Sequence, residues 1–312
     1  MDLSVIIVCY KGWERLYKCL AALDTFTQKS FSMEVIIVDN NSGDGKINDL
    51  EAKFSRFRFI KTIINGGYAY GCNLGATSAS GNVFMILNPD TIVKEDAIEK
   101  LLQLSIAHPE YYIISCRQVG ENGKEQKSAG KFPGISKRKI LKGNPGASFS
   151  FPDWVSGSLM MFRKETFQSL QGFDESFWMY YEDVDICLRA RMSGGEVAFR
   201  DDVEIRHIHG GSSRIDLKTT SITKSEVLIS RHFYIHKHLK GIRRILLHSL
   251  EICDNLATGL ITGIIGLIFF FIPRLFVRFL ILLRLIQYYT GSVLRRSWMS
   301  PRSVKSKTAG HL

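Results

Sequence analysis

The sequence predicts an α/β fold, in which helices flank a mostly parallel central sheet. It also predicts a hydrophobic helical segment at the C-terminus that associates with a membrane. Three observations support this prediction. Short apolar runs rich in β-branched residues alternate with helical patterns along the first third of the chain, as expected for a parallel sheet with helical crossovers. Polar clusters follow the ends of three of these runs. Long apolar runs bordered by arginines fill the last fifth.

Four short apolar runs rich in β-branched residues are expected to form buried parallel strands. They are Ser4–Tyr10, Glu34–Asn40, 57–63 and Asn82–Asn88. Helical patterns separate them at Trp13–Phe26, at Lys46–Phe54, in a helix that begins with Cys72–Ser80, and at Lys94–Ala107. In such sheets ligands bind beyond the carboxyl ends of the strands. The clusters "CYKG", "DNNSGDG" and "NPDT" are expected there.

The middle of the chain is less regular. Gly120–Pro152 is rich in Gly, Lys and Ser and is expected to be an exposed loop region. The stretch "WVSGSLMMFRKETF" then predicts a strand followed by a helix, and Ser221–Lys240 predicts an amphipathic helix with many basic residues.

The C-terminal region predicts a pair of membrane-associated helices. Leu256–Ile272 holds no charge over 17 residues, which corresponds to about 26 Å of helix, just short of a hydrocarbon core of ~30 Å. A buried core hairpin is the alternative, but the rest of the sequence offers no apolar surface to cover it. We therefore expect the helices to lie on the membrane or to re-enter it rather than to span it, with the basic tail attracted to anionic lipids.

Composition limits the cellular setting. The chain of 312 residues is 45% hydrophobic and 23% charged, which is typical of a globular protein. Its six cysteines are scattered and form no Cys-x-x-Cys pair, so we expect neither a zinc cluster nor a disulfide framework, and a reducing compartment. The first residues run directly into a strand, so we expect no signal peptide. The net charge of +11 belongs largely to the tail, next to an apolar run, which disfavours nucleic-acid binding.

Asn88 and Asp90 form the first candidate ligand pair. They follow a buried strand two residues apart, and alternation along an extended chain points both side chains the same way. An amide and a carboxylate there would hold a hard cation such as Mg²⁺ or Mn²⁺ together with a substrate diphosphate. The alternative is a turn that caps the next helix, since Asp and Thr are good cap residues.

Two further clusters are candidate donor sites. Asp39 ends a strand in "DNNSGDG", where it would accept hydrogen bonds from a nucleobase or ribose, and the glycines let a ligand approach the backbone. "NGGYAYGCNLGA" places two glycines at the mouth of a helix, where backbone N–H groups would meet a diphosphate. Both clusters also fit simple turns, and the second lacks the G-x-G-x-x-G spacing of a dinucleotide site.

The stretch "FWMYYEDVD" supplies candidate catalytic carboxylates and candidate aromatic binding residues. Glu182, Asp183 and Asp185 are either a negatively charged first helical turn or a group of carboxylates with a raised pKa, one of which acts as a base. Trp178 and Tyr180, just before them, either stack on a ring of a ligand or pack in the core. In "IRHIHGGSS", His207 and His209 stand at alternating positions. A lone histidine is usually structural, whereas two histidines at this spacing favour a set of ligands.

These motifs together resemble family 2 glycosyltransferases, within them the rhamnosyltransferase-like branch, over roughly Leu3 to Lys240. The resemblance rests on "SVIIVCYKG", "VIIVDNNSGDG", "NGGYAYGCNLGA", "MILNPDT", "GFDESFWMYYEDVDICLRARMSGG" and "HIHGGSS", in this order. It implies a Rossmann-like GT-A fold over residues 1–240, as the catalytic domain, with membrane-associating helices and a basic tail over 241–312. It also implies inverting sugar transfer from a nucleotide-sugar donor.

The resemblance assigns roles to single residues. Asp183 matches the base that deprotonates the acceptor hydroxyl, with Glu182 and Asp185 as its neighbours. Asp90 matches the last acidic residue of the family's metal-binding D-x-D, whose first position is Asn88 here, a departure that weakens the charge of the site. His207 best matches a metal-supporting histidine, with His209 as a second candidate. The implied acceptor-binding residues are Trp178, Tyr180 and Glu182; the implied donor-binding residues are Val8, Tyr10, Asp39, Asn41, Asn65, Gly67, Asn73, Asn88 and Asp90.

The leading hypothesis is therefore a metal-dependent glycosyltransferase that builds bacterial cell-surface polysaccharide at the cytoplasmic face of the inner membrane, as a peripheral or monotopic protein. dTDP-rhamnose is the donor that the branch implies, and a glycan or lipid-linked molecule is the acceptor; homo-oligomerisation stays open. One alternative is a nucleotidyltransferase, which would carry a glycine-rich basic loop after the first strand, where this chain has only Lys11 and Arg15. The other is a non-catalytic, membrane-tethered scaffold derived from a glycosyltransferase.

Overall fold

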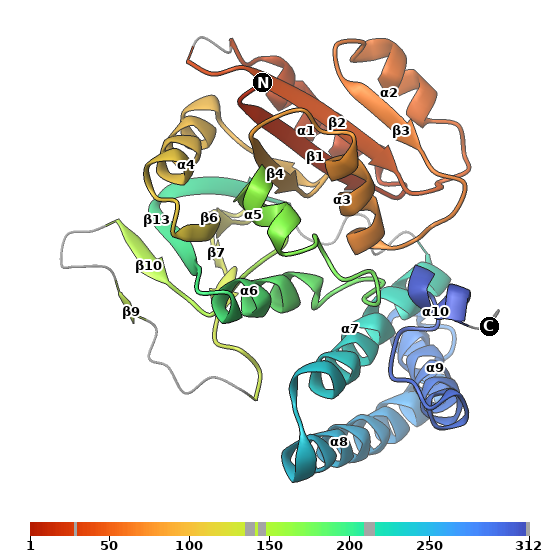
Figure 1. Cartoon of the computed structure of the whole chain (residues 1–312). Coiled ribbons are helices and arrows are strands. Elements are labelled where there is room, and N and C mark those ends of the chain that lie inside the picture. The colour runs from red at the N-terminus through yellow and green to blue at the C-terminus, as the bar shows by residue number, and fades with distance from the viewer. Residues whose placement is uncertain (28–29, 135–140, 143–147, 209–215, 310–312) are drawn as a thin grey trace. The chain divides into compact units, whose positions relative to one another are not determined.

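The computed structural model describes residues 1–27, 30–134, 141–142, 148–208 and 216–309 (Figure 1). The chain forms two compact units. The first comprises Met1–Asn65, Ala69–Asp174 and Glu182–Ser212, and the second comprises Gly66–Tyr68, Glu175–Tyr181 and Ser213–Leu312. The first unit holds the sheet, and the second unit is helical.

The sheet of the first unit has the strand order β3-β2-β1-β4-β12-β6-β13-β10-β9 in the part of the chain that the structure describes, with β5 paired to β13 and β7 paired to β6. The strands are β1 (Leu3–Cys9), β2 (Met33–Asp39), β3 (Arg58–Lys61), β4 (Val83–Leu87), β5 (Thr91–Ile92), β6 (Tyr111–Val119), β7 (Glu125–Gln126), β9 (Leu141–Lys142), β10 (Phe149–Phe151), β12 (Leu159–Arg163) and β13 (Glu196–His207). A separate two-stranded sheet pairs β8 (Ala129–Gly130) with β11 (Trp154–Val155).

Parallel pairing dominates the long strands. β1 lies between β2 and β4, parallel to both, and β13 runs parallel to β6. β12 is antiparallel to β4 and to β6, so it separates two parallel blocks. This arrangement confirms the predicted mostly parallel sheet. It also places the carboxyl ends of β1, β2 and β4 at one edge.

Helices cover both faces of the sheet. They are α1 (Trp13–Asp24), α2 (Ile47–Lys53), α3 (Tyr68–Thr77), α4 (Glu95–Ala107), α5 (Lys164–Ser169) and α6 (Glu182–Met192). Alternate residues of β1, such as Val5 and Ile7, pack in one core with residues of α1, α2 and α4. The residues between them, Ile6 and Val8, face α3 instead.

Two glycines bring α3 against the sheet. A Cβ atom on Gly71 would lie 2.6 Å from Cγ1 of Val8, and one on Gly75 would lie 2.4 Å from Cγ2 of Ile6. Real Cβ atoms do not approach other carbons so closely, so any side chain at these positions would push the helix away from β1. The glycines of "YAYGCNLGA" thus serve helix–sheet packing.

The predicted elements of the first third are present, with bounds shifted by a few residues. The prediction of a buried strand at 57–63 was wrong in its burial, since β3 is a short strand and none of its four residues is buried. The third helix differs most, because it begins at Tyr68 rather than near Cys72. Two central strands, β6 and β13, were not predicted. The expectation that Gly120–Pro152 is all loop was wrong in its described part, since β7, β8, β9 and β10 fall there and β10 pairs with β13.

The second unit contains α7 (Leu217–His238), α8 (Gly241–Ile268), α9 (Pro273–Arg295) and α10 (Val304–Ala309). α7, α8 and α9 pack together through a small core that includes Ile229, Leu285 and Tyr288, with Trp298 against it. α8 and α9 are each long and apolar enough to cross a membrane, by length and composition only. The compact units divide before α7 rather than at residue 240, so the division into a catalytic domain and a membrane-associating segment stays a functional prediction.

Candidate active site

Asp90 and His207 lie together although 117 residues separate them in the sequence. β4 ends at Leu87, and the chain turns through Asn88–Asp90 into β5, where Thr91 lies opposite His207 of β13. Oδ1 of Asp90 is 3.1 Å from Nε2 of His207, and the Asp90 carbonyl accepts the N–H of Ile208 at 2.9 Å. Both side chains are buried. The antiparallel β5–β13 pairing thus builds the predicted metal pair.

This pair offers a carboxylate oxygen and an imidazole nitrogen to a cation. Among the described residues, no group of three or more His, Cys, Asp and Glu side chains could hold a metal, and His209 lies outside the described residues. The pair therefore fits a divalent cation that takes its remaining ligands from a diphosphate and water. It does not fit a metal centre made by protein alone.

The turn at Ser156–Ser158 connects this strand end with the first residues of α6. The Ser158 carbonyl accepts the N–H of Asn88 at 2.9 Å. The N–H of the adjacent Gly157 donates to Oδ2 of Asp183, also at 2.9 Å. A single turn therefore fixes both the Asn88–Asp90 segment and the Asp183 carboxylate, so the two predicted clusters converge within the first unit.

Asp183 and Glu182 differ in their environments. Asp183 is half-buried, and burial raises its pKa, while hydrogen bonds from the N–H groups of Gly157 and Val184 oppose the rise because they stabilise the carboxylate. Glu182 is buried, and burial together with the charge of Asp183 raises its pKa well above the ordinary value. Asp183 is thus the better site for negative charge, and Glu182 is the better site for a proton.

Asp185 has a structural partner. Its carboxylate is fully buried and accepts a hydrogen bond from Nε of Arg189 at 2.8 Å. The same guanidinium donates to the carbonyls of Leu170 and Gly172. Asp185 therefore ties α6 to the turn after α5 through Arg189. The ion pair thus gives Asp185 a structural role, and its catalytic role stays a prediction.

Asp39 ends β2 at the same edge, in register with Cys9 of β1. Its Oδ1 accepts hydrogen bonds from Oγ of Ser42 at 2.5 Å and from the Ser42 N–H at 3.2 Å, which closes a tight turn. Asn41 occupies the left-handed region inside that turn, with φ of 60°, and its amide donates to the Ile63 carbonyl. Asp39 is buried, so the turn holds it in one orientation at the predicted donor site.

Other predicted donor residues have structural contacts of their own. The Asn73 amide bonds the backbone of Phe173 at both ends, with N···O distances of 2.9 Å, so it clamps the segment before α6. Val8 packs on Gly71, Tyr10 lies under the Lys11 ammonium, and Asn65 is the last residue of the first unit before Gly66. The donor roles of these residues stay predictions.

Gly67, Trp178 and Tyr180 belong to the second unit. The Trp178 carbonyl accepts the N–H of Tyr68 at 2.7 Å, and a Cβ on Gly67, whose φ is 93°, would lie 2.1 Å from that carbonyl. Trp178 is buried, with 7% of its surface exposed, whereas Tyr180 is half-buried. Packing therefore accounts for most of the Trp178 ring, and Tyr180 is the more accessible of the two aromatic residues.

Sequence reasoning gave no role to Ser42, Gly157 and Ser158. Ser42 follows Asp39 by three residues, a spacing typical of a side-chain-capped turn. "SGS" at 156–158 precedes a strand and has the composition of a tight turn. Neither signal shows which carboxylate or strand end the turn will contact.

Comparisons with known proteins place the chain among sugar-transferring enzymes. The family model described as glycosyl transferase family 2 matches residues 4–180. The low-salt glycan biosynthesis hexosyltransferase Agl10 of Haloferax volcanii is 30% identical over 200 residues, which cover 61% of this chain and 62% of Agl10. The match thus spans less than two thirds of that relative.

A second relative is the N-acetylglucosaminyl-diphospho-decaprenol L-rhamnosyltransferase of Mycobacterium tuberculosis. It is 25% identical over 233 residues, which cover 66% of this chain and 75% of the relative. Among solved structures, GalNAc-T7 with UDP, GalNAc and Mn²⁺ is similar with a TM-score of 0.55 and 16% identity, over 67% of this chain and 43% of that one. This likeness shows the same fold.

Proposed function

The chain belongs to glycosyl transferase family 2, and from that premise we propose that it is an inverting glycosyltransferase. It moves a sugar from a nucleotide-diphosphate sugar to a hydroxyl of a glycan or lipid-linked acceptor in cell-surface polysaccharide synthesis. The observation that carries the proposal is the Ser156–Ser158 turn, which holds the Asp183 carboxylate and the Asn88–Asp90 segment at once.

Asp183 is the proposed general base. The acceptor hydroxyl gives its proton to the Asp183 carboxylate while its oxygen forms a bond to the anomeric carbon of the donor. The bond between that carbon and the diphosphate oxygen breaks with its electron pair, and the nucleoside diphosphate leaves. A displacement of this kind needs one base and no protein nucleophile. The backbone donors from Gly157 and Val184 orient the carboxylate for the step.

Glu182 is the proposed proton-holding neighbour of Asp183. Two adjacent carboxylates, one buried and one half-buried, do not ionise together easily, because each charge disfavours the other. The pKa of Glu182 is raised by burial and by the charge of Asp183, so it carries a proton when Asp183 is ionised. In this form it is an acid that donates to an acceptor oxygen, which agrees with its predicted acceptor-binding role.

Asp90, His207 and Asn88 are the proposed residues at the donor diphosphate. A bound Mg²⁺ or Mn²⁺ would neutralise the charge that develops on the leaving diphosphate. Asp90 and His207 would supply protein ligands for it, since their side chains already lie 3.1 Å apart. Asn88 adds a neutral amide where the family pattern has an acid, so the donor itself contributes most of the negative charge.

Asp39 is the proposed contact to the donor nucleotide, since it stands at the carboxyl edge of β2 beside β1. dTDP-rhamnose is the proposed donor, because one relative is a rhamnosyltransferase. That relative's name also places a sugar on a diphospho-polyprenol, which supports a lipid-linked acceptor here.

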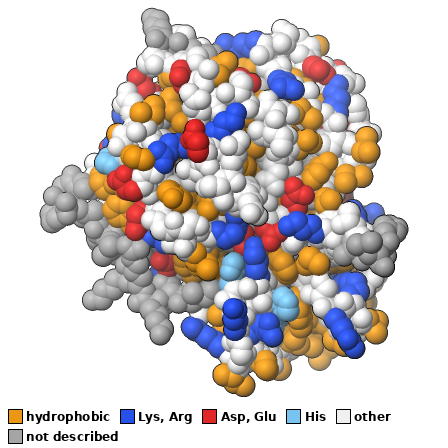
Figure 2. Space-filling model, viewed as in Figure 1, with side chains coloured by type: hydrophobic (Ala, Val, Ile, Leu, Met, Phe, Trp, Pro, Cys, Tyr) orange, Lys and Arg blue, Asp and Glu red, His pale blue; other side chains and the backbone are white. Residues whose placement is uncertain are grey.

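A membrane surface is the proposed working site. Exposed apolar side chains lie on a broad stripe of α8, about 200° wide, in two groups before Glu251 and after Gly259: Ile242, Ile245, Leu246, Leu250, Leu260, Ile261, Ile264, Ile265, Leu267 and Ile268. The 28 residues of the helix make the stripe about 40 Å long. Figure 2 shows apolar and basic side chains sharing the surface over α8 and α9.

This stripe favours a helix that lies in the membrane plane over one that spans. Glu251 and Asp254 lie in the middle of α8, and Glu251 pairs with Arg231 of α7 at 2.6 Å, so part of α8 stays beside polar groups. Arg243 lies in the first turn of α8, Arg274 and Arg278 lie in the first two turns of α9, and the chain has no acidic residue after Asp254. Basic residues beside an apolar stripe fit the anionic cytoplasmic leaflet.

A donor screen tests the proposed function. Purified protein is offered dTDP-, UDP- and GDP-sugars with Mn²⁺, Mg²⁺ or chelator, and hydrolysis and binding are measured. We expect turnover of one nucleotide class, with dTDP-rhamnose as the preferred donor, and stimulation by a divalent cation. Absence of both binding and turnover with every donor would instead support the scaffold alternative.

A further inference from the structure

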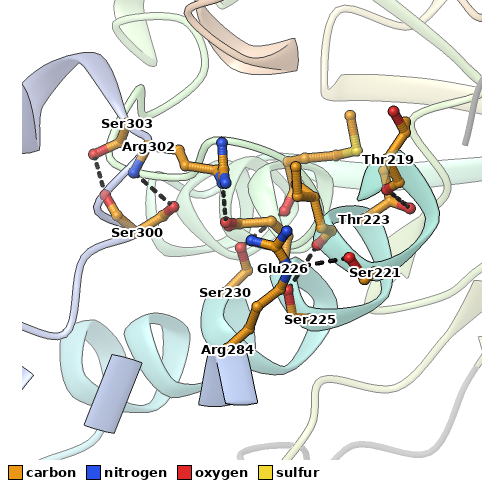
Figure 3. A network of polar contacts seen from close by, with 12 residues as sticks. Thr219, Ser221, Thr223, Ser225, Glu226, Ser230, Arg284, Ser300, Arg302 and Ser303 are labelled. Carbon is orange, nitrogen blue, oxygen red and sulfur yellow. Dashed lines mark hydrogen bonds and ion pairs between the residues drawn. The ribbon is translucent and has the colours of Figure 1, made fainter. Parts of the chain in front are cut away.

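Residues 296–309, here called the C-terminal arm, fold back onto α7 after α9 ends. Ser300 and Ser303 of the arm are buried, and the Ser303 hydroxyl donates to the Ser300 carbonyl at 2.9 Å. Figure 3 shows Arg302 of the arm pointing at Glu226 of α7. Nε of Arg302 is 3.6 Å from Oε1 of Glu226, and the Ser300 side chain hydrogen-bonds the same carboxyl group.

Glu226 is an unusual anchor because it is 1% exposed. Its Oε2 has no hydrogen-bond partner in the part of the chain that the structure describes. Burial raises the pKa of Glu226 to about 7, against the opposing effects of Ser300, Arg302 and Arg284. A carboxyl buried in this way depends on the few groups that reach it, and two of them come from the C-terminal arm.

The other side of the Arg302 guanidinium faces Trp178. Its Cζ lies 5.7 Å from the centroid of the indole ring, within the range of a cation–π contact. Arg302 therefore stands between a buried carboxyl group and the aromatic residue that the sequence places at the acceptor. Trp178, Arg302 and Glu226 all belong to the second unit.

Residues 175–181, which include Trp178, have a backbone conformation that depends on contacts with neighbouring residues. Tyr180 and Tyr181 both have positive φ angles, 69° and 67°, which non-glycine residues adopt only when their surroundings impose it. α7 makes two contacts that hold this segment. The Ser230 hydroxyl donates to the Met179 carbonyl at 2.8 Å, and Phe233 packs edge-on against Phe177. The next residues in the chain are Glu182 and Asp183.

We propose that Arg302 is a positioning residue through which the C-terminal arm holds residues 175–181 in the conformation that receives the acceptor. The proposal rests on the proposed function. Glu226 fixes the guanidinium, the guanidinium fixes the indole of Trp178, and the strained backbone at Tyr180 and Tyr181 is kept in place. The proposed donor contacts Asp39, Asn88 and Asp90 lie in the first unit, so donor hydrolysis is expected to proceed without this contact.

Two readouts test the proposal on the full-length protein. The first is hydrogen–deuterium exchange of residues 175–181, which needs no enzymatic activity. Arg302→Gln removes the charge and is expected to increase exchange there, whereas Arg302→Lys keeps a cation and restores part of the protection. Lys307→Gln is the matched control, because it removes one positive charge from an exposed position of the same arm and should leave exchange unchanged.

The second readout separates acceptor from donor kinetics. We expect Arg302→Gln to raise the acceptor KM by about tenfold, the scale of one lost cation–π contact, with donor hydrolysis unchanged. Trp178→Leu in the same chain should add little to that effect, because both changes remove one contact.

Wild-type exchange over 175–181 in Arg302→Gln would overturn the proposal, and so would an equal loss of donor hydrolysis and acceptor transfer. If the wild-type protein turns over no nucleotide sugar at all, the proposed function fails. In that case the exchange experiment still decides whether Arg302 holds the segment.

Discussion

Nε2 of His207 lies 3.1 Å from Oδ1 of Asp90, across the pairing of β5 with β13. Asn88 stands two residues before Asp90, where an aspartate would add a second negative charge. We expect Asn88→Asp to lower the Mn²⁺ concentration needed for half-maximal donor turnover, and His207→Ala to raise it by roughly 10–100-fold. Metal titrations of donor hydrolysis measure both. The same Mn²⁺ requirement in all three proteins would show that the cation binds elsewhere.

Asp183→Asn should abolish transfer, with a fall in kcat of about 10²–10⁴, the usual contribution of a general base. Donor binding, measured by calorimetry, should persist. Glu182→Gln is the matched control, because it replaces a protonated acid with a neutral amide and should retain most of the activity. Near-wild-type transfer by Asp183→Asn would place the base at another residue.

The pH profile of transfer should report the same carboxylate. The pKa of Asp183 is raised above its ordinary value of 3.8, so the base is protonated and inactive at low pH. As the pH is lowered, we expect kcat/KM for the acceptor to begin to fall at a pH above 3.8. In Asp183→Glu the fall should occur at a different pH but should still lie on the acidic side of the profile. A profile that is flat down to the acid unfolding of the protein would contradict the assignment.

Arg189→Met should destabilise the first unit strongly. It would leave Asp185 fully buried and without its ion-pair partner, a change that typically costs about 3–5 kcal/mol. The control is Arg200→Met, which breaks the more exposed pair with Asp202 and should cost less than about 1 kcal/mol. Urea unfolding followed by circular dichroism compares the two. Equal losses would show that Asp185 does not depend on Arg189.

His232 should make the second unit sensitive to acid. It is buried, with Nδ1 3.1 Å from Nδ1 of His248 and Nε2 3.0 Å from the Tyr289 hydroxyl, and burial lowers its pKa from 6.5 to about 3. The unfolded chain therefore binds protons more readily. The contribution of neutral, buried His232 to the free energy of unfolding is fully present above pH 6.5 and is lost as the pH falls toward 3. Urea unfolding measured at several pH values between 3 and 6.5 gives the free energy of unfolding at each pH. This free energy should change less with pH in His232→Gln than in the wild type.

The apolar stripe of α8 should hold the protein on anionic vesicles. Replacing Leu260, Ile261 and Ile264 with Gln removes three exposed apolar side chains, and we expect binding to phosphatidylglycerol vesicles to fall at least tenfold, since each buried methylene contributes about 0.8 kcal/mol. Flotation measures binding, and circular dichroism checks that the helix content is unchanged. Full binding of the variant would show that this face does not meet the lipid.

Local patterns predicted the parallel half of the sheet well. β1, β2 and β4 are continuous apolar runs, so their burial on both faces follows from composition alone. β13 was missed because Arg200, Asp201, Asp202 and Glu204 interrupt its apolar residues, and the pairing with β6 accommodates them by a shift of register between Arg200 and Glu204. An irregular strand of this kind is specified by its neighbour in the sheet rather than by its own period.

The site was predictable in its residue types but not in its pairings. The motifs marked Asp39, Asp90, Asp183 and His207, and the sheet topology explains why the first two share an edge. Nothing in the spacing of "EDVD" indicates that Asp183 would bond Gly157 while Asp185 bonds Arg189, because both choices depend on which turn packs against α6. Partners distant in the sequence become visible only in the folded chain.

With α8 lying in the membrane plane, as proposed, the stripe of about 40 Å sets how the enzyme finds its acceptor. A lipid-linked acceptor would then approach by lateral diffusion within the same leaflet, while the water-soluble donor would arrive from the aqueous phase. Turnover would follow the number of acceptor molecules per area of membrane rather than their number per volume. Diluting the acceptor with inert lipid at constant total amount would slow the reaction.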